Sequence, residues 1–149
     1  MKAKFFLPFV ALAACTEVPV AVAPPEETAP TVAMSPPPVP PANATTVDQF
    51  DTTTAADRAA AIAPVAVSDV SLGVTVASLG SPAEPGIWLK TPLVTAVSAG
   101  RVIYQGKSVN VELRPSGGAA GSGSQISLAA MRLIEAPLTS LAELTVFRN

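Results

Sequence analysis

The residue best suited to chemistry is Cys15, the only cysteine of the 149-residue chain. It closes a short apolar segment, Phe5 to Ala14, which Lys2 and Lys4 precede. The segment is too short to span a bilayer of about 30 Å as a helix. A basic start, an apolar run and small residues before a cleavage site are typical of a signal peptide. Leu12-Ala13-Ala14-Cys15 therefore predicts a lipobox, at which the leader is removed and the Cys15 thiol is acylated.

Acylation of Cys15 would fix the mature chain to a membrane, because each buried CH₂ of an acyl chain contributes about 0.8 kcal/mol. Thr16 follows the cysteine, where aspartate would favour the inner membrane. We therefore expect an exported protein, anchored by lipid to the bacterial outer membrane and facing the periplasm. The alternatives are an ordinary signal peptide that contains a cysteine, or a buried apolar strand.

Composition argues against several kinds of chemistry. The chain has no histidine, so it lacks the commonest general base at neutral pH. One cysteine allows neither an internal disulfide nor a zinc site of the usual Cys/His kind. Without its leader the chain carries seven basic and eleven acidic residues, a balance that disfavours nucleic acid. We expect no metal and no cofactor.

Two pairs of side chains remain as candidates for a site. Glu84 and Glu112 could cleave a glycosidic bond if their carboxylates were suitably spaced, but Glu112 is expected on the outer face of its strand. Trp88 and Tyr104 are candidate ligand-binding residues, because an aromatic face can stack on a sugar ring. The alternative for both aromatic residues is a place in the core or at its rim. We assign no catalytic residue.

The chain divides into three parts. Residues 1–14 form the predicted signal peptide, and residues 15–46 the lipidated cysteine with a Pro-rich tether. Thr16 to Val47 contains nine prolines and no glycine. Proline fixes φ and removes a backbone donor, so this segment favours a disordered, extended spacer of about 3.1 Å per residue over a helix or sheet. A motif that binds a partner groove is the alternative. Residues 47–149 form the cargo domain.

The cargo domain begins with a helix and continues as short strands. Thr54-Ala55-Ala56-Asp57 has the spacing of a capping box, and the helix should run from Ala55 to Ala63, before Pro64. All nine glycines lie from Gly73 onward, which indicates a turn-rich β region. In the first strand Leu72, Val74 and Val76 form one apolar face. Further strand candidates are Trp88-Leu89, Leu93 to Val97, Val102 to Tyr104, and Ser108 to Arg114, with a turn at Gln105-Gly106-Lys107.

The last part of the chain mixes a loop, a helix and a strand. Ser116 to Ser124 predicts a flexible loop, with an anion-binding nest of backbone N–H groups as the alternative. Ser127 should cap a helix from Leu128 to about Glu135 that buries Leu128, Met131 and Ile134. A final strand is expected over Glu143 to Arg148. This order predicts a mostly β fold, a small closed or half-closed barrel with one or two short helices.

Part of the domain resembles a known family. Gly106-Lys107-Ser108-Val109-Asn110-Val111-Glu112-Leu113 and Ile126-Ser127-Leu128-Ala129-Ala130 resemble the strand and the helix start of double-psi β-barrels of the rare lipoprotein A type. The resemblance implies a double-psi-like barrel. Active members cleave peptidoglycan glycan strands with a loop aspartate, where this chain has Pro115-Ser116-Gly117. The likeness therefore implies the fold and not the catalytic residues.

A second, closer resemblance is to small alphaproteobacterial envelope lipoproteins. It rests on Thr75 to Gly80, Trp88 to Val94 and Ser127 to Thr139. Such proteins are often labelled D-galactarate dehydratase, although the genuine dehydratase is a much larger metal-dependent enzyme.

The leading hypothesis is a non-catalytic, membrane-anchored envelope lipoprotein that binds peptidoglycan or another envelope protein. The alternative is an enzyme, either a divergent peptidoglycan glycosidase or the sugar-acid dehydratase of the label. A third possibility is an assembly role that acts through the tether.

Overall fold

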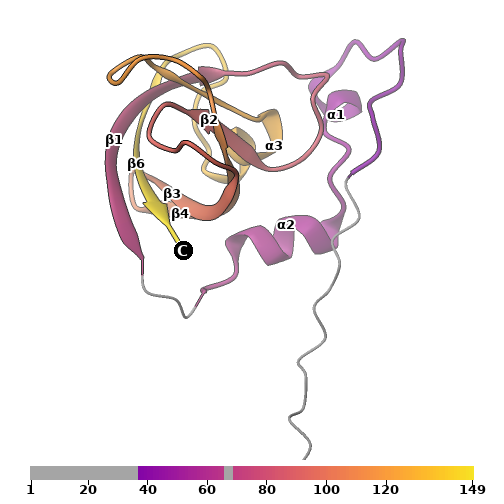
Figure 1. The fold of residues 1–149 in the computed structure, drawn as a ribbon. Helices are drawn as coiled ribbons and strands as arrows, with labels where there is room; N and C mark the ends of the chain where they lie inside the picture. The colour runs from indigo at the N-terminus through magenta and orange to yellow at the C-terminus, as the bar shows by residue number, and fades with distance from the viewer. Residues whose placement is uncertain (1–36, 66–68) are drawn as a thin grey trace, which may run out of the picture. The chain divides into compact units, whose positions relative to one another are not determined.

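The computed structural model describes residues 37–65 and 69–149, and these form a mostly β domain with a few short helices. Six strands close into a barrel in the order β1-β5-β2-β4-β3-β6 (Figure 1). Two neighbouring pairs, β1 with β5 and β2 with β4, are parallel, and the other pairs are antiparallel. The predicted small closed barrel is confirmed. Cys15 and the predicted leader lie outside the described residues.

The described chain contains three short helices and six strands. The helices are α1 (Val47–Phe50), α2 (Ala55–Ile62) and α3 (Leu128–Leu133). The strands are β1 (Val70–Leu79), β2 (Trp88–Thr91), β3 (Ser98–Tyr104), β4 (Lys107–Pro115), β5 (Ser124–Ile126) and β6 (Ala142–Arg148). In the part of the chain with described structure, no helix is both long and apolar enough to cross a membrane.

The hairpin of β3 and β4 matches its prediction. Gln105 and Gly106 have φ values of 46° and 83°, as a two-residue turn between twisted strands requires. Along β4 the predicted alternation also holds, because Val109, Val111 and Leu113 are buried in the barrel interior. The strict alternation and the Gly-containing turn together set the register of this hairpin.

In β1 the predicted apolar face is wrong for Val74 and Val76, whereas Leu72 packs against the core. Val74 and Val76 are 58% and 45% exposed, whereas Thr75 and Ala77 are buried. The register with β6 shifts between Ser71 and Gly73, and Gly73 has a φ of 112°. This irregularity changes which residues of the strand face inward. Thr75 can lie inside because its hydroxyl is 2.7 Å from that of buried Ser124, so either oxygen can donate to the other.

Two further differences concern short segments. Leu93 to Val97 was expected as a strand but forms the connection between β2 and β3, after Pro92. The predicted loop from Ser116 to Ser124 ends at the first residue of a strand that was not predicted, β5. This three-residue strand pairs in parallel with β1 and antiparallel with β2. Hydrogen bonding to both neighbours, rather than its own apolar content, makes this segment a strand.

The helix α3 contributes Ala130 and Met131 to the core. The Ser127 side chain accepts from the N–H of Ala130 at 3.3 Å, as the predicted cap requires. Leu128, Met131 and Ile134 are all buried, which confirms the predicted inner face. The same hydroxyl accepts from the N–H of Trp88 at 3.1 Å and thereby joins α3 to β2.

The segment before β1 is attached to the barrel by polar contacts. Asp51 has a side chain only 4% exposed, and one of its oxygens lies 2.8 Å from Arg132 of α3. Asp48 also binds Arg132, at 2.9 Å. At the other end of α2, the Asn110 amide of β4 donates to the carbonyls of Ala60 and Ala63 at 3.3 and 2.9 Å. These contacts hold α2 along the outer face of β4, where it runs below the barrel in Figure 1.

The start of α2 is predicted to depend on pH. The Asp57 carboxylate accepts from the Thr54 N–H at 2.9 Å and from its hydroxyl at 2.7 Å, which completes the predicted capping box. These bonds hold the pKa of Asp57 below its ordinary value. The stabilisation is therefore present above the unfolded-state pKa of about 3.9 and is lost as the pH falls through the lower folded-state pKa.

An NMR titration of the Asp57 carboxyl carbon measures this effect. We expect a midpoint below about 3.9, and a higher midpoint in the Thr54→Ala variant, which lacks the hydroxyl donor. A midpoint at or above the ordinary aspartate value in the unaltered chain would show that the cap does not form.

Candidate functional site

Trp88 lies on the outer side of β2, yet its side chain is fully buried. The loop from Gly80 to Gly86 covers the ring. The indole N–H of Trp88 donates to the Glu84 carbonyl of this loop at 3.4 Å. Gly80 makes this packing possible, since a Cβ there would overlap the aromatic ring. Lys90 Nζ and Arg114 Cζ lie over the ring, 4.9 and 5.4 Å from its centroid. Cations and loop thus cover the ring, and a sugar could stack on it only after they move.

A group of charged side chains surrounds this tryptophan. The two oxygens of Glu84 bind Lys90 Nζ at 2.6 Å and Arg114 Nη1 at 2.7 Å. Arg114 Nε also binds Glu112 at 2.5 Å. The two candidate acids therefore meet on one guanidinium, which the sequence did not indicate. The arrangement positions both carboxylates to fix Arg114.

Tyr104 lies in a different part of the barrel. It ends β3 opposite Lys107, whereas Trp88 lies opposite Glu112, near the other end of β4. Its ring is partly buried and packs against the core, and its hydroxyl accepts from Gln105 Nε2 at 3.1 Å. The structure therefore does not bring the two candidate aromatic residues together.

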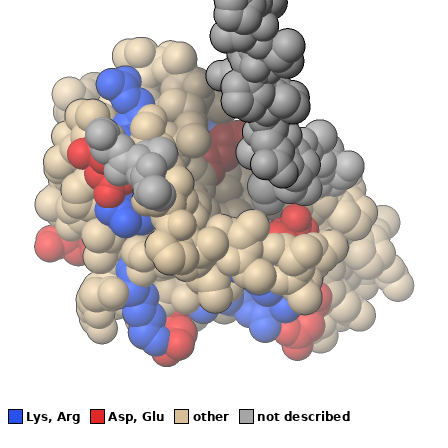
Figure 2. Space-filling model, turned by 90° about the horizontal axis from the view of Figure 1, so that it is seen from below, with Lys and Arg blue, Asp and Glu red and all other residues tan. Residues whose placement is uncertain are grey.

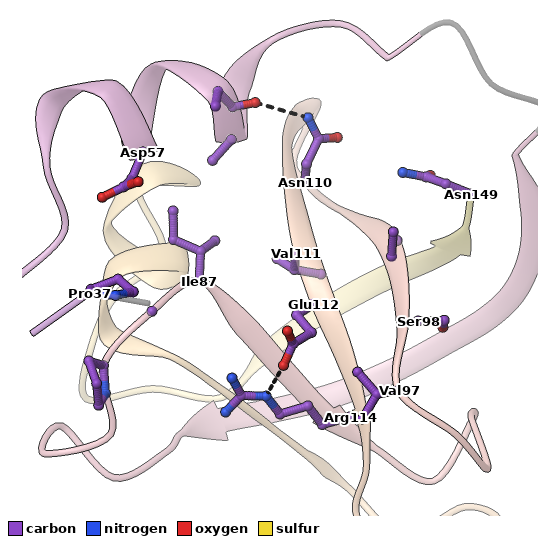
Figure 3. Close-up of a pocket in the computed structure, with 16 residues that line it drawn as sticks. Pro37, Asp57, Ile87, Val97, Ser98, Asn110, Val111, Glu112, Arg114 and Asn149 are labelled. Carbon is purple, nitrogen blue, oxygen red and sulfur yellow. Dashed lines mark hydrogen bonds and ion pairs between the residues drawn. The ribbon is translucent and has the colours of Figure 1, made fainter. Parts of the chain in front are cut away.

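A groove of about 510 Å³ lies between α2, the loop before β2, and the strands β3 and β4. Figure 3 shows α2 along one side and the sheet along the other. Its lining is mainly apolar: Ala60, Ala61, Pro85, Gly86, Ile87, Val97, Ala99, Gly100 and Val111. The volume falls within the range of about 300–1,000 Å³ typical of ligand sites. Small residues on both walls leave the space open.

Polar groups also line this groove. Asp57, Glu112, Arg114 and Asn110 line it together with Ser98 and Asn149 (Figure 3). Asn110 is occupied in holding α2, and Glu112 is paired with Arg114. The groove therefore combines a mainly apolar lining with a few polar groups, a combination common in ligand sites.

Charges elsewhere on the domain are mixed. Figure 2 shows acidic and basic side chains interspersed over the face seen from below. Several are paired across elements, such as Arg101 with Asp69 and Lys107 with Glu135. Among residues 37–65 and 69–149, no three His, Cys, Asp or Glu side chains are grouped so that they could hold a metal ion.

The sequence does not predict the groove, because its walls come from four separate segments: α2, the loop before β2, and the strands β3 and β4. No local pattern relates these segments before the barrel closes. Comparisons of the chain with protein-family models, with curated proteins and with solved structures find no match.

Proposed function

We propose that the chain is a lipid-anchored protein of the bacterial envelope whose barrel binds a segment of another envelope protein. The observation that carries the proposal is the groove between α2 and the sheet, whose lining is mainly apolar. An extended peptide or a short helix could bury apolar side chains there, as in other groove-binding modules. The groove favours such a polypeptide over the wall glycan, because most of its lining residues have no polar side chain.

The sequence supports the anchored part of this proposal. Leu12-Ala13-Ala14-Cys15 has the form of a lipobox, and the prolines that follow suit a spacer between membrane and domain. The chain would then belong to the small envelope lipoproteins that it resembles, and the binding domain would face the periplasm from the outer membrane. The double-psi connectivity is part of the same proposal, supported by the two parallel pairs within a six-stranded barrel.

Site-specific photocross-linking tests the proposal. A photoreactive residue is placed at Val97, which lines the groove and is 61% exposed, in the full-length chain in the bacterium that produces it. The control position is Leu141, which lies outside the groove lining and is 69% exposed. We expect a discrete protein adduct from Val97 and none from Leu141. Adducts of the same size from both positions, or none from Val97, would contradict the proposal.

Anchoring is tested separately. In the full-length chain, Cys15→Ser should abolish incorporation of a labelled fatty acid and release the protein from the membrane fraction. Retention of the label in Cys15→Ser would show that another residue is acylated. That result would not test the proposal that the groove binds a protein segment.

A further inference from the structure

A second pocket lies where the end of β4 and the loop after it face β2 and β5. Its volume is about 470 Å³, and its polar lining residues are Lys90, Ser116, Ser122 and Gln125. Lys90 and Gln125 are cross-strand partners on the outer face of β2 and β5. None of these four residues lines the groove. The two pockets therefore have different linings, and they adjoin where Lys90 of β2 pairs with Arg114 of β4.

The pocket combines hydrogen-bond donors and acceptors. The Ser116 hydroxyl oxygen accepts from the Gly118 N–H at 3.2 Å, so its own proton can point toward a ligand. The Ser122 hydroxyl donates to the Ala119 carbonyl at 2.7 Å, so its oxygen can accept. Gln125 adds an exposed amide, which can both donate and accept hydrogen bonds. A ligand with several hydroxyl or amide groups would match this lining.

The charge of the pocket argues for a neutral ligand. Lys90 is the one charged residue among those that line it in the described chain, and its ammonium lies 2.6 Å from Glu84 Oε2. Lys90, Arg114, Glu84 and Glu112 form a cluster of two cations and two carboxylates, so the cluster carries no excess charge. The remaining N–H groups of the ammonium can still donate. An anion would have to compete with Glu84 for Lys90, whereas a neutral hydroxyl would not.

We propose that this pocket binds a neutral saccharide. The hydroxyls of Ser116 and Ser122, the Gln125 amide and the Lys90 ammonium bind its hydroxyl or acetamido groups. The pocket and the groove share no lining residue, so a saccharide would not occupy the space of a protein partner.

Trp88 is a built-in reporter of this binding. It is the only tryptophan of the chain, and Lys90 Nζ lies 4.9 Å from its ring centroid. A ligand that binds Lys90 alters the charge environment of the indole and thus its emission. The full chain is titrated in a detergent without a sugar headgroup, with chitotetraose and cellotetraose as neutral probes and a tetragalacturonate as the anionic probe.

We expect a saturable change of Trp88 emission with at least one neutral probe, at a Kd of about 1 mM or below, and weaker binding of the anionic probe. Gln125→Ala and Ser122→Ala should each raise the Kd about 2- to 10-fold, as loss of a hydrogen bond predicts. Gln105→Ala, in the exposed β3–β4 turn, is the matched control and should leave the Kd unchanged.

No saturable change with either neutral probe would overturn the proposal, as would binding that Gln125→Ala and Ser122→Ala leave unaltered. Tighter binding of the anionic probe would also contradict it. Ala99→Phe, which fills the groove, separates the two sites: it should block the Val97 adduct and leave the saccharide Kd unchanged.

Discussion

Replacing Trp88 with alanine is expected to lower the free energy of unfolding by about 3–5 kcal/mol. The ring is fully buried, and its removal leaves a cavity beneath the Gly80–Gly86 loop. The variant also loses the indole hydrogen bond to Glu84 and the contacts with two cations. Urea unfolding followed by far-UV circular dichroism measures the change, since the fluorophore itself is removed.

Tyr104→Phe is the control for this variant. Tyr104 is only partly buried and its hydroxyl contacts the exposed Gln105, so the change should stay within about 0.5 kcal/mol. A loss below about 1 kcal/mol for Trp88→Ala would show that the ring is not packed as described. If the predicted loss is found, any ligand binding lost in this variant reports unfolding and not sugar stacking.

Gly100→Ala is expected to destabilise the barrel by about 1–3 kcal/mol or more. Gly100 lies in the middle of the sheet, opposite Val111 of β4 and Arg148 of β6. An added Cβ would overlap the Leu113 side chain and come within 2.5 Å of the Phe147 carbonyl oxygen. A backbone oxygen cannot yield without moving β6, so the strain spreads across two strands.

The matched control is Ala99→Ser, one residue earlier on the same strand and exposed, which should change stability by about 0.5 kcal/mol at most. Thermal unfolding of the two variants compares them directly. Equal melting temperatures would mean that β3 and β6 do not approach each other at Gly100 as described.

The parts of the fold that could be predicted are those with strong local signals. In β4 the alternation of valine and leucine with polar residues matches one buried face, and Gln105-Gly106 favours the turn before it. Ser127 likewise marks the start of α3. Each of these features depends on neighbours a few residues away, which a sequence pattern contains.

Other features depend on partners far away in the chain. The inward face of β1 is set by the irregularity at Gly73 against β6, so the valine pattern alone was misleading. The strand β5 exists because β1 and β2 pair with both its edges. The burial of Trp88 depends on Gly80, where a side chain would overlap the ring. The groove depends on the position of α2, and the ion pair of Asp51 with Arg132 holds the preceding segment to the barrel. No local spacing encodes such contacts.

Filling the groove shows whether α2 and the sheet form a binding site. In the full-length chain with the photoreactive residue at Val97, Ala99→Phe places a ring among the groove residues, whereas Ala119→Phe adds the same ring to the exposed loop before β5. We predict that Ala99→Phe abolishes the adduct and that Ala119→Phe preserves it, with both variants folded and anchored. An adduct that survives Ala99→Phe would place the partner elsewhere and contradict the assignment of the groove.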